Sequence, residues 1–364
     1  MGGIKDVLEP GLIVLTFALG VSINRRPFRS SARDDELRSL LGDESSSAIK
    51  QLNDPAWIQK LLPDNSRFRK NIISRILAAF PFLIEIGYWN LMYWIYQLAR
   101  AYSAVKIRNN DAVYDKSRSH AVSILSMERS VHLNMEQPIQ RWVREHFSSL
   151  FRLLTLIYYS HIVLLVAFIV YTYTYYPRKV FQQIRRTLAG CNLIAFIVMT
   201  AFRVMPPRML PEKYGFVDIF HPKHGEPGSS WTNNKYQLTI AAMPSLHFGT
   251  AALISFSIIR WSPHAPLRFV AIFWPFAMLF TILATANHYI LDAAVGALVP
   301  VVAWCINDGF LILRPLEEWM YWICRTEKPL AADEDPPRMT EVENDSDHQH
   351  SRQRLEGQDI DGPG

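Results

Sequence analysis

Six stretches of roughly 20 mostly apolar residues limit what this chain can fold into more than any other feature of its sequence. A helix needs about 20 such residues to cross the hydrocarbon core of a bilayer. The stretches are residues 76–98, 153–176, 187–205, 238–259, 268–287 and 289–313. They predict an all-α integral membrane protein whose core is a six-helix transmembrane bundle.

The amino-acid composition agrees with a membrane protein. Of the 364 residues, 49% are apolar, 12% are aromatic and only 20% are charged. Charged residues make up about a quarter of an ordinary soluble domain. These values exclude a disordered chain, a collagen-like chain and a small disulfide scaffold.

Polar segments flank the predicted bundle, which we place at residues 72–326. Residues 1–71 form an N-terminal extension, in which the apolar run 11–23 predicts a short signal-anchor or interfacial helix. Residues 327–364 hold eleven acidic and four basic residues and almost no large apolar side chain. That composition is typical of a disordered acidic tail.

Two segments inside the predicted bundle are not apolar enough to cross a membrane. In residues 118–150, apolar side chains at helical spacing predict one amphipathic helix, either on the membrane surface or packed against the bundle. Their common face comprises Ile124, Met127, Val131, Met135, Ile139 and Val143. Residues 206–237 are rich in proline and glycine and predict a long loop.

Basic residues in short loops predict the orientation of the bundle. The expected loop at 177–187 contains Arg178, Lys179, Arg185 and Arg186, and the next on that side contains Arg260 and Arg268. Since cytosolic loops carry an excess of Lys and Arg, we expect this side and the C-terminal tail to be cytosolic. The loop at 206–237 then faces the lumen or the exterior of a multi-pass membrane protein.

The sequence gives no sign of a metal, a cofactor or a nucleic-acid partner. The three cysteines, Cys191, Cys305 and Cys324, are too few and too scattered for a disulfide framework, and no Cys/His spacing fits a zinc site. Basic residues do not alternate with aromatic ones as in a nucleic-acid-binding face. The expected partners are membrane lipids.

Ionisable residues near the ends of the predicted spans are the candidates for chemistry. His247 lies at the start of the fourth predicted span, and His288 and Asp292 lie at the start of the sixth. The i, i+4 spacing puts His288 and Asp292 on one helical face, where a carboxylate can orient the imidazole. Arg208, at the start of the long loop, presents a planar fork that matches a phosphate. All four lie on the predicted non-cytosolic side.

These residues are sufficient for phosphoryl transfer without a metal. His288 would attack phosphorus to form a phosphohistidine, Asp292 would orient it, and His247 would protonate the leaving oxygen. Pro244 is expected as the first helical residue of the fourth span, so that backbone N–H groups near Ser245 can bind an anion. Those groups and the substrate-binding candidates Arg208, Ser245, Lys213 and Lys235 would hold the phosphate oxygens.

The motifs Pro244-Ser245-x-His247 and His288-x3-Asp292 resemble the second and third signature blocks of the type 2 phosphatidic acid phosphatase (PAP2) superfamily. Their context is similar to the branch that contains the inositol phosphorylceramide synthases. The resemblance covers about residues 120–310. It implies a six-helix core with an extracytosolic site, and the roles of nucleophile, orienting acid and general acid for His288, Asp292 and His247. It also implies a phosphate-binding role for Arg208.

The chain departs from the superfamily pattern at cationic positions. The first block is Lys-x6-Arg-Pro, but here Ala201 stands at the lysine position and Met209 follows Arg208. The third block begins Ser-Arg, but here the pair is Thr281-Ile282, and Leu246 replaces the glycine of the second block. These departures favour the synthase-like branch. They also keep open an alternative, a non-catalytic lipid transporter or structural subunit that retains the fold.

Several polar residues have competing interpretations. Ser245 is either a helix cap or a phosphate ligand, and His161 either supports the site or, more commonly for such a residue, bonds to another helix. Glu85 is expected to be a buried, paired or protonated structural acid. Asp218, His221 and His224 either bind a polar head group or are solvated, the second being the more common case.

Overall fold

The computed structural model describes residues 3–26, 56–219 and 238–329, and this part of the chain is almost entirely helical. Within it no β-strand forms, and Val204 and Ala241 make an isolated bridge. The helices are α1 (Gly3–Ile23), α4 (Ala56–Gln59), α5 (Ile72–Ala79), α6 (Phe82–Ile107), α7 (Asp111–Ser130), α8 (Glu136–His146), α9 (Leu150–Tyr175), α10 (Arg178–Ala201), α11 (Leu246–Trp261), α12 (Ala265–Ala284), α13 (Ile290–Cys305) and α14 (Arg314–Ile323).

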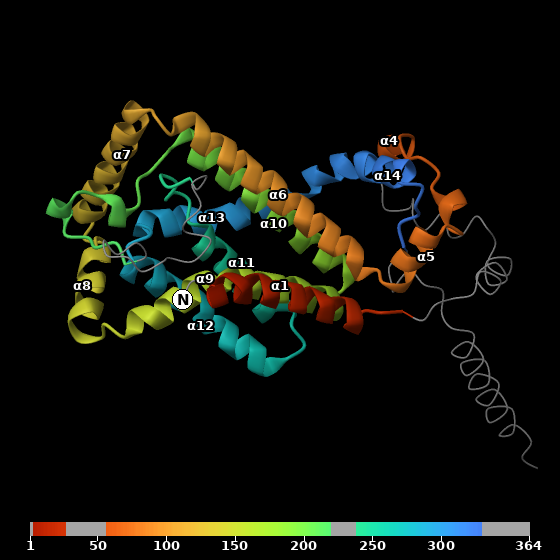
Figure 1. Ribbon diagram of the computed structural model, residues 1–364, viewed down its shortest axis with the longest axis horizontal. Helices are drawn as coiled ribbons and strands as arrows, with labels where there is room; N and C mark the ends of the chain where they lie inside the picture. The colour runs from red at the N-terminus through yellow and green to blue at the C-terminus, as the bar shows by residue number, and fades with distance from the viewer. Residues whose placement is uncertain (1–2, 27–55, 220–237, 330–364) are drawn as a thin grey trace, which may run out of the picture.

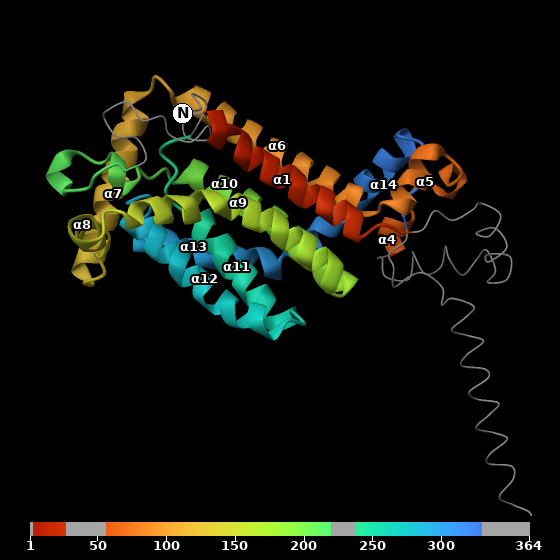
Figure 2. The same cartoon turned by 60° about the horizontal axis from the view of Figure 1, so that its bottom comes forward.

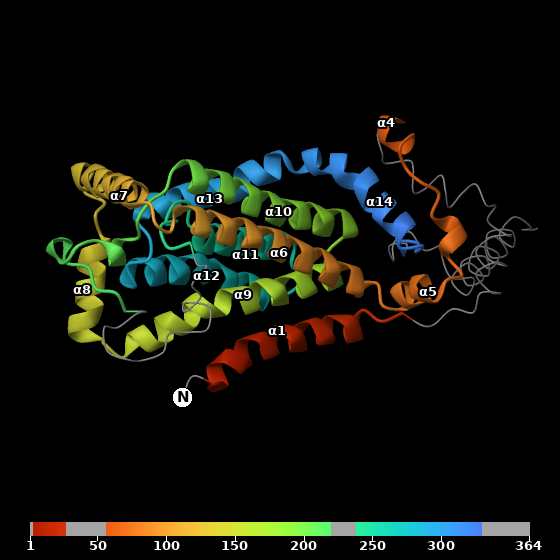
Figure 3. The same cartoon turned by 45° about the horizontal axis from the view of Figure 1, so that its top comes forward.

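The long helices form an elongated bundle with shorter helices at its two ends. α7 and α8 lie across one end, and α4, α5 and α14 lie at the other (Figure 1). The same separation is visible in two further orientations (Figures 2 and 3). We call the α7/α8 end the histidine end, because α11 and α13 begin there with His247 and His288 close by, and the α5/α14 end the opposite end.

Three helices, α9, α10 and α12, are long and apolar enough to cross a membrane. Two bent pairs, α5 with α6 and α13 with the segment that includes α14, raise the number to five if each pair is one span. The expected count of six is therefore not confirmed. α11 and α13 have 16 residues each, which is about 24 Å of helix. The first part of the predicted stretch 238–259 lies before α11, and the last part of 289–313 forms the 3-10 helix Asn307–Leu313 after α13.

Two predicted helix boundaries are wrong. The basic segment expected as a loop at 177–187 belongs to α10, which begins at Arg178 directly after Pro177. Arg185 and Arg186 are accommodated in the helix because the first bonds Glu85 and the second bonds Asn307 and Asp308. The helix predicted over 118–150 is broken between α7 and α8, where His132 has a φ of 57°.

The predicted apolar face of that broken helix is divided between core and exterior. Ile124 and Val143 are buried, whereas Met127, Val131 and Met135 are exposed. The N-terminal apolar run lies in α1, whose apolar part, Pro10–Ile23, is shorter than the helices that are long enough to cross a membrane. α1 packs on α9 and α6, and Asn24 Nδ2 donates to Thr174 Oγ1 at 3.0 Å.

Candidate functional site

His288 lies in the tight connection between α12 and α13 and is 7% exposed. The preceding turn includes Ala286, whose φ is 53°. His288 Nδ1 lies 2.7 Å from the carbonyl oxygen of Ala242. A carbonyl can only accept a hydrogen bond, so Nδ1 carries the proton and donates it. The lone pair of the neutral ring is therefore on Nε2.

Asp292 lies one turn into α13, behind His288, and is completely buried. Its Oδ2 is 3.6 Å from His288 Nδ1 and accepts the backbone N–H of Tyr289 at 3.0 Å. Its own carbonyl oxygen accepts the N–H of Ser245 at 2.9 Å. Asp292 thus links His288 to the beginning of α11. The shorter bond to Nδ1 comes from Ala242, which the sequence had not indicated.

His247 lies in the first turn of α11, and its ring centroid is 5.8 Å from that of His288. The ring of Tyr158 stacks on it at 4.2 Å, with 23° between the planes. The two histidines predicted to act together are therefore neighbours at one end of the bundle, although 41 residues separate them in the sequence.

His161 of α9 is a third histidine at this place, with its ring centroid 4.2 Å from that of His247. Its Nδ1 donates to the carbonyl of Tyr158 at 2.8 Å, within its own helix. Among the described residues, the expected bond to another helix is not made. The i, i+3 spacing of Tyr158 and His161 puts both rings on one face of α9, but only the fold shows that this face meets α11.

Arg208 is fixed against the segment that carries His288. Its backbone N–H donates to Ala286 O at 2.9 Å, and Nε donates to Asn287 Oδ1 at 2.9 Å. Nη1 donates to Asp218 Oδ2 at 2.8 Å. Asp218, expected more commonly as a solvated residue, is therefore a partner of Arg208.

The other predicted phosphate ligands are less well placed. Ser245 is buried and is the N-cap of α11, accepting the Phe248 N–H at 3.4 Å. The helix begins at Leu246, so Pro244 is not its first residue as expected; it follows a cis peptide bond outside the helix. Lys213 is exposed, with Nζ 5.3 Å from the Tyr214 ring. Lys235, His221 and His224 lie outside the described residues.

Two glycines allow the helices that carry the histidines to touch. A Cβ atom added to Gly296 of α13 would lie 2.3 Å from the carbonyl oxygen of Ser245. One added to Gly249 of α11 would lie 2.3 Å from the carbonyl oxygen of Gly296. Because no Cβ contact is that short in real proteins, only glycine permits this approach, which brings His247 to Asp292 and His288.

Two buried glutamates, Glu128 of α7 and Glu136 of α8, cap the beginning of α13. The sequence had not indicated this role. Glu128 Oε1 accepts the N–H of Leu291 at 2.8 Å, and Glu136 Oε1 accepts that of Ile290 at 2.9 Å. Burial and the nearby Glu136 raise the pKa of Glu128 to about 8, and burial also raises the pKa of Glu136. The two carboxyl groups therefore satisfy backbone donors next to His288, in an environment that favours the protonated form of both.

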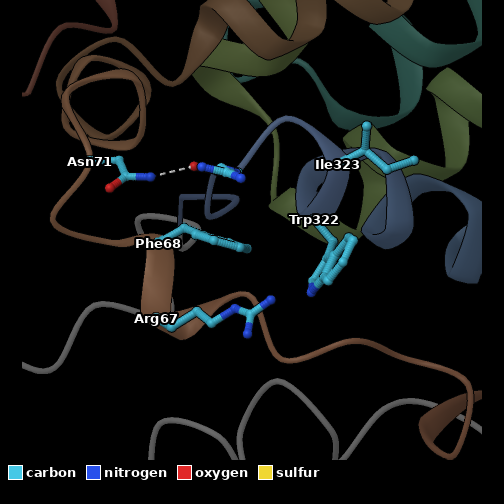
Figure 4. Close-up of a pocket in the computed structure, with 6 residues that line it drawn as sticks. Arg67, Phe68, Asn71, Trp322 and Ile323 are labelled. Atoms are coloured by element: carbon cyan, nitrogen blue, oxygen red, sulfur yellow. Dashed lines mark hydrogen bonds between the residues drawn. The ribbon is translucent and has the colours of Figure 1, made fainter.

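A cavity of about 510 Å³ lies at the opposite end of the bundle, far from these residues (Figure 4). Its walls come from the segments around α14 and the 3-10 turn Ser66–Phe68. The guanidinium of Arg67 lies 4.7 Å from the Phe68 ring and 5.3 Å from the Trp322 ring. None of the predicted site residues lines this cavity. Across the described ranges, no three His, Cys, Asp or Glu side chains are grouped to hold a metal ion.

Comparison with known proteins agrees with the resemblance found in the sequence. No curated protein and no solved structure matches the chain. The family model described as the PAP2 superfamily matches residues 122–306, which is just over half of the chain and includes α8 to α13. The chain therefore belongs to the PAP2 superfamily.

Proposed function

We propose that this protein is a membrane enzyme that transfers or hydrolyses the phosphoryl group of a lipid phosphate through a phosphohistidine on His288. Membership of the PAP2 superfamily suggests a phosphatase or phosphotransferase acting on lipid phosphates. The observation that carries the more specific proposal is the pair of imidazoles, 5.8 Å apart, in which His288 keeps its lone pair on Nε2. A single phosphoryl group can contact both rings at this separation.

In the first step, His288 Nε2 attacks phosphorus, and the bond between phosphorus and the leaving oxygen breaks. His247, protonated at the start, gives its proton to that oxygen. The phosphorylated His288 ring keeps its proton on Nδ1 and becomes positively charged. The Asp292 carboxylate, 3.6 Å away, stabilises this charge.

In the second step, water or an alcohol attacks phosphorus, and His247, now neutral, takes the proton from the attacking oxygen. The bond between phosphorus and His288 Nε2 breaks, and both histidines return to their first state. Arg208 and the first N–H groups of α11 hold the phosphate oxygens in both steps. No metal takes part in this scheme.

Transfer and hydrolysis differ only in the attacking group. The motif context favours the inositol phosphorylceramide synthase-like branch, in which the acceptor is an alcohol, and the long loop at 206–237 offers room for one. The basic residues of α10 and Arg260 are at the other end of the bundle, and basic residues are in excess on the cytosolic side. The histidine end would then face the lumen, which for the synthase-like branch is that of the Golgi or endoplasmic reticulum.

The proposal is tested with the purified full chain in detergent, supplied in turn with phosphatidate, a polyprenyl diphosphate, and a phosphoinositide with ceramide. We expect turnover of at least one substrate, and a loss of at least about 10³-fold, or about 4 kcal/mol, in His288→Ala. The matched control is His264→Ala, since His264 bonds Tyr171 at the other end of α11. Ceramide-linked phosphoinositol without free phosphate would identify transfer.

Vanadate gives an independent test, because it mimics five-coordinate phosphorus bound to a histidine. We expect inhibition by vanadate and little effect of a chelator. Strict magnesium dependence, or turnover that His288→Ala leaves unchanged, would overturn the mechanism. No turnover on any of the substrates, together with no binding of vanadate, would favour the non-catalytic alternative.

A further inference from the structure

Arg100 lies on the face of α6 that is directed toward the histidine end of the bundle. Tyr96, Arg100 and Ala104 follow each other at intervals of four residues and so share a helical face. Tyr96 and Ala104 pack against the apolar cluster that contains Leu246 and Ala286. Leu246 directly precedes His247, and Ala286 lies two residues before His288. Arg100 is thus on the side of α6 that meets the histidine end.

Arg100 is half-buried, and among the described residues its guanidinium lies over an aromatic ring rather than beside an acid. Its Cζ lies 5.6 Å from the centroid of the Tyr96 ring. Its Nε has less than 1 Å² of exposed surface and no hydrogen-bond acceptor among the described residues. The positive charge acts on both His247 and Tyr158, which stack on each other. Arg100 therefore lies near the proposed general acid.

A buried guanidinium N–H without an acceptor is costly. Arginine stays protonated in proteins, and a buried donor that lacks its partner is destabilising, more so when it is charged. The Tyr96 ring offers Arg100 a ring face but no anionic oxygen. A phosphate group held between His247 and His288 would provide that oxygen.

Two positions of the superfamily motifs carry no cation in this chain. At the two positions where the superfamily resemblance implies phosphate-binding cations, this chain has Ala201 and Ile282. Ile282 is completely buried in an apolar cluster with Met278 and Ala251. Arg100 precedes residue 122, where the family match begins, so the matched region does not include it.

We propose that Arg100 binds the phosphate group of the lipid phosphate and supplies, from α6, positive charge that the superfamily motifs of this chain lack. The inference rests on the proposed function, because it assigns a ligand to the same site. Arg208 and Arg100 come from different elements, so phosphate oxygens can be held by two cations while His288 attacks phosphorus.

The test compares Arg100→Gln with Lys106→Gln, which removes one positive charge from an exposed position of the same helix. Each full-length protein is assayed with the lipid phosphate that the wild type turns over, and the inhibition constant for vanadate is measured. A charge-assisted hydrogen bond is worth about 1.5–3 kcal/mol. We therefore expect Arg100→Gln to raise KM and the vanadate inhibition constant by about 10- to 100-fold, and Lys106→Gln to change either by less than about threefold.

The outcomes separate the two proposals. If the wild type turns over and binds vanadate but Arg100→Gln behaves like Lys106→Gln, the role of Arg100 is overturned and the proposed function stands. If the wild type neither turns over substrate nor binds vanadate, the proposed function fails, and the role of Arg100 fails with it. A fall in kcat with KM and vanadate binding unchanged would also contradict a binding role.

Arg100→Lys keeps the test decisive if Arg100→Gln does not fold. Lysine retains the charge but not the planar fork of arginine. We expect it to bind vanadate more weakly than the wild type by several-fold and more tightly than Arg100→Gln. An unchanged vanadate constant in a folded Arg100→Lys protein would show that the guanidinium does not contact the phosphate group.

Discussion

The two ends of the bundle use buried charge in different ways. At the opposite end, acids and bases are joined in pairs. Both oxygens of Glu85, which is 3% exposed, lie 3.1 Å from Arg185 Nη1, and Oε1 also lies 3.4 Å from Arg178. Glu327 binds Arg69 through two bonds of 2.9 Å. Each of these three guanidinium groups therefore has a carboxylate partner, although Arg178 Nε itself has no acceptor among the described residues.

At the histidine end, positive and negative groups are held apart on different elements. Glu128, Glu136 and Asp292 accept backbone N–H groups around the start of α13, and each keeps one buried oxygen without a hydrogen bond among the described residues. The guanidinium of Arg100 has no carboxylate partner there. Since buried polar groups are normally satisfied, the guanidinium of Arg100, which has no acid beside it, is the group at this end that an anionic ligand could satisfy. Paired charge stabilises the fold, and separated charge is available for binding.

The largest effect should come from breaking a pair at the opposite end. Glu85→Ala leaves Arg185 and Arg178 without their counter-charge, so we expect the free energy of unfolding to fall by about 2–4 kcal/mol. This is less than the loss of about 3–5 kcal/mol for breaking a fully buried pair, because both arginines are partly exposed. Activity per folded molecule should remain within about twofold. Thermal unfolding and kcat in detergent measure the two quantities. A tenfold loss of kcat with unchanged stability would break the comparison.

A smaller loss of stability, accompanied by a loss of activity, is expected where α11 and α13 touch. Gly296→Ala forces its Cβ against the Ser245 carbonyl, at a cost of about 1–3 kcal/mol, and moves His247 away from His288. The control is Gly87→Ala in α6, where a Cβ meets open space and the helix should gain about 0.5–1 kcal/mol. Equal effects of the two substitutions on the melting temperature would show that the contact does not hold the site.

The sequence was informative where a pattern is local. Long apolar runs predicted α9 and α12 closely, because a span must be apolar along its whole length. The positions of His247, His288 and Asp292 followed from motif spacing. Local patterns fail where a distant partner decides the outcome. Arg185 was expected in a loop, since nothing near it in the sequence shows that Glu85 satisfies it inside a helix.

The same reason explains which residues near the site were not predicted. Glu128 was one charged residue of an amphipathic segment. Periodicity shows which face of a helix it shares, but not that it caps another helix through a bond to a residue 163 positions later. Arg100 follows an apolar run and was not distinguished from an interfacial cation. In both cases the position depends on the packing of one helix against another, which a single sequence does not contain.

A moderate effect on activity is expected from Asp292→Asn. Asparagine removes the negative charge, but the Ala242 carbonyl still fixes the Nδ1 proton of His288. We expect kcat to fall by about 10- to 100-fold, which is about 1.4–2.7 kcal/mol and corresponds to one charge-assisted interaction. The much larger loss seen when a carboxylate alone sets the tautomer should not occur. A fall of 10⁴-fold in single-turnover rate would show that Asp292, not Ala242, orients the ring.

The smallest effect is on the pH dependence of stability and involves Glu128. Its pKa is raised from 4.5 to about 8 by burial and by Glu136, so the folded protein keeps a proton that the unfolded chain has lost at neutral pH. Stability should therefore fall as pH rises toward 8 and level off above it. One such group corresponds to about 1 kcal/mol between pH 7 and pH 8.

Glu128→Gln is the variant that isolates the contribution of Glu128 to the pH dependence of stability. Its amide oxygen can still accept the Leu291 N–H and its amide group can donate to Glu136, so the cap of α13 is retained without a titrating group. We expect the melting temperature of the variant to vary less between pH 7 and pH 8 than that of the wild type, with Glu145→Gln, an exposed position of α8, as the control. If Glu128→Gln shows the same pH dependence as the wild type, the proton is not held by this pair. The separated acids of the histidine end would then be fully charged, and the electrostatic contrast between the two ends would be larger than the structure indicates.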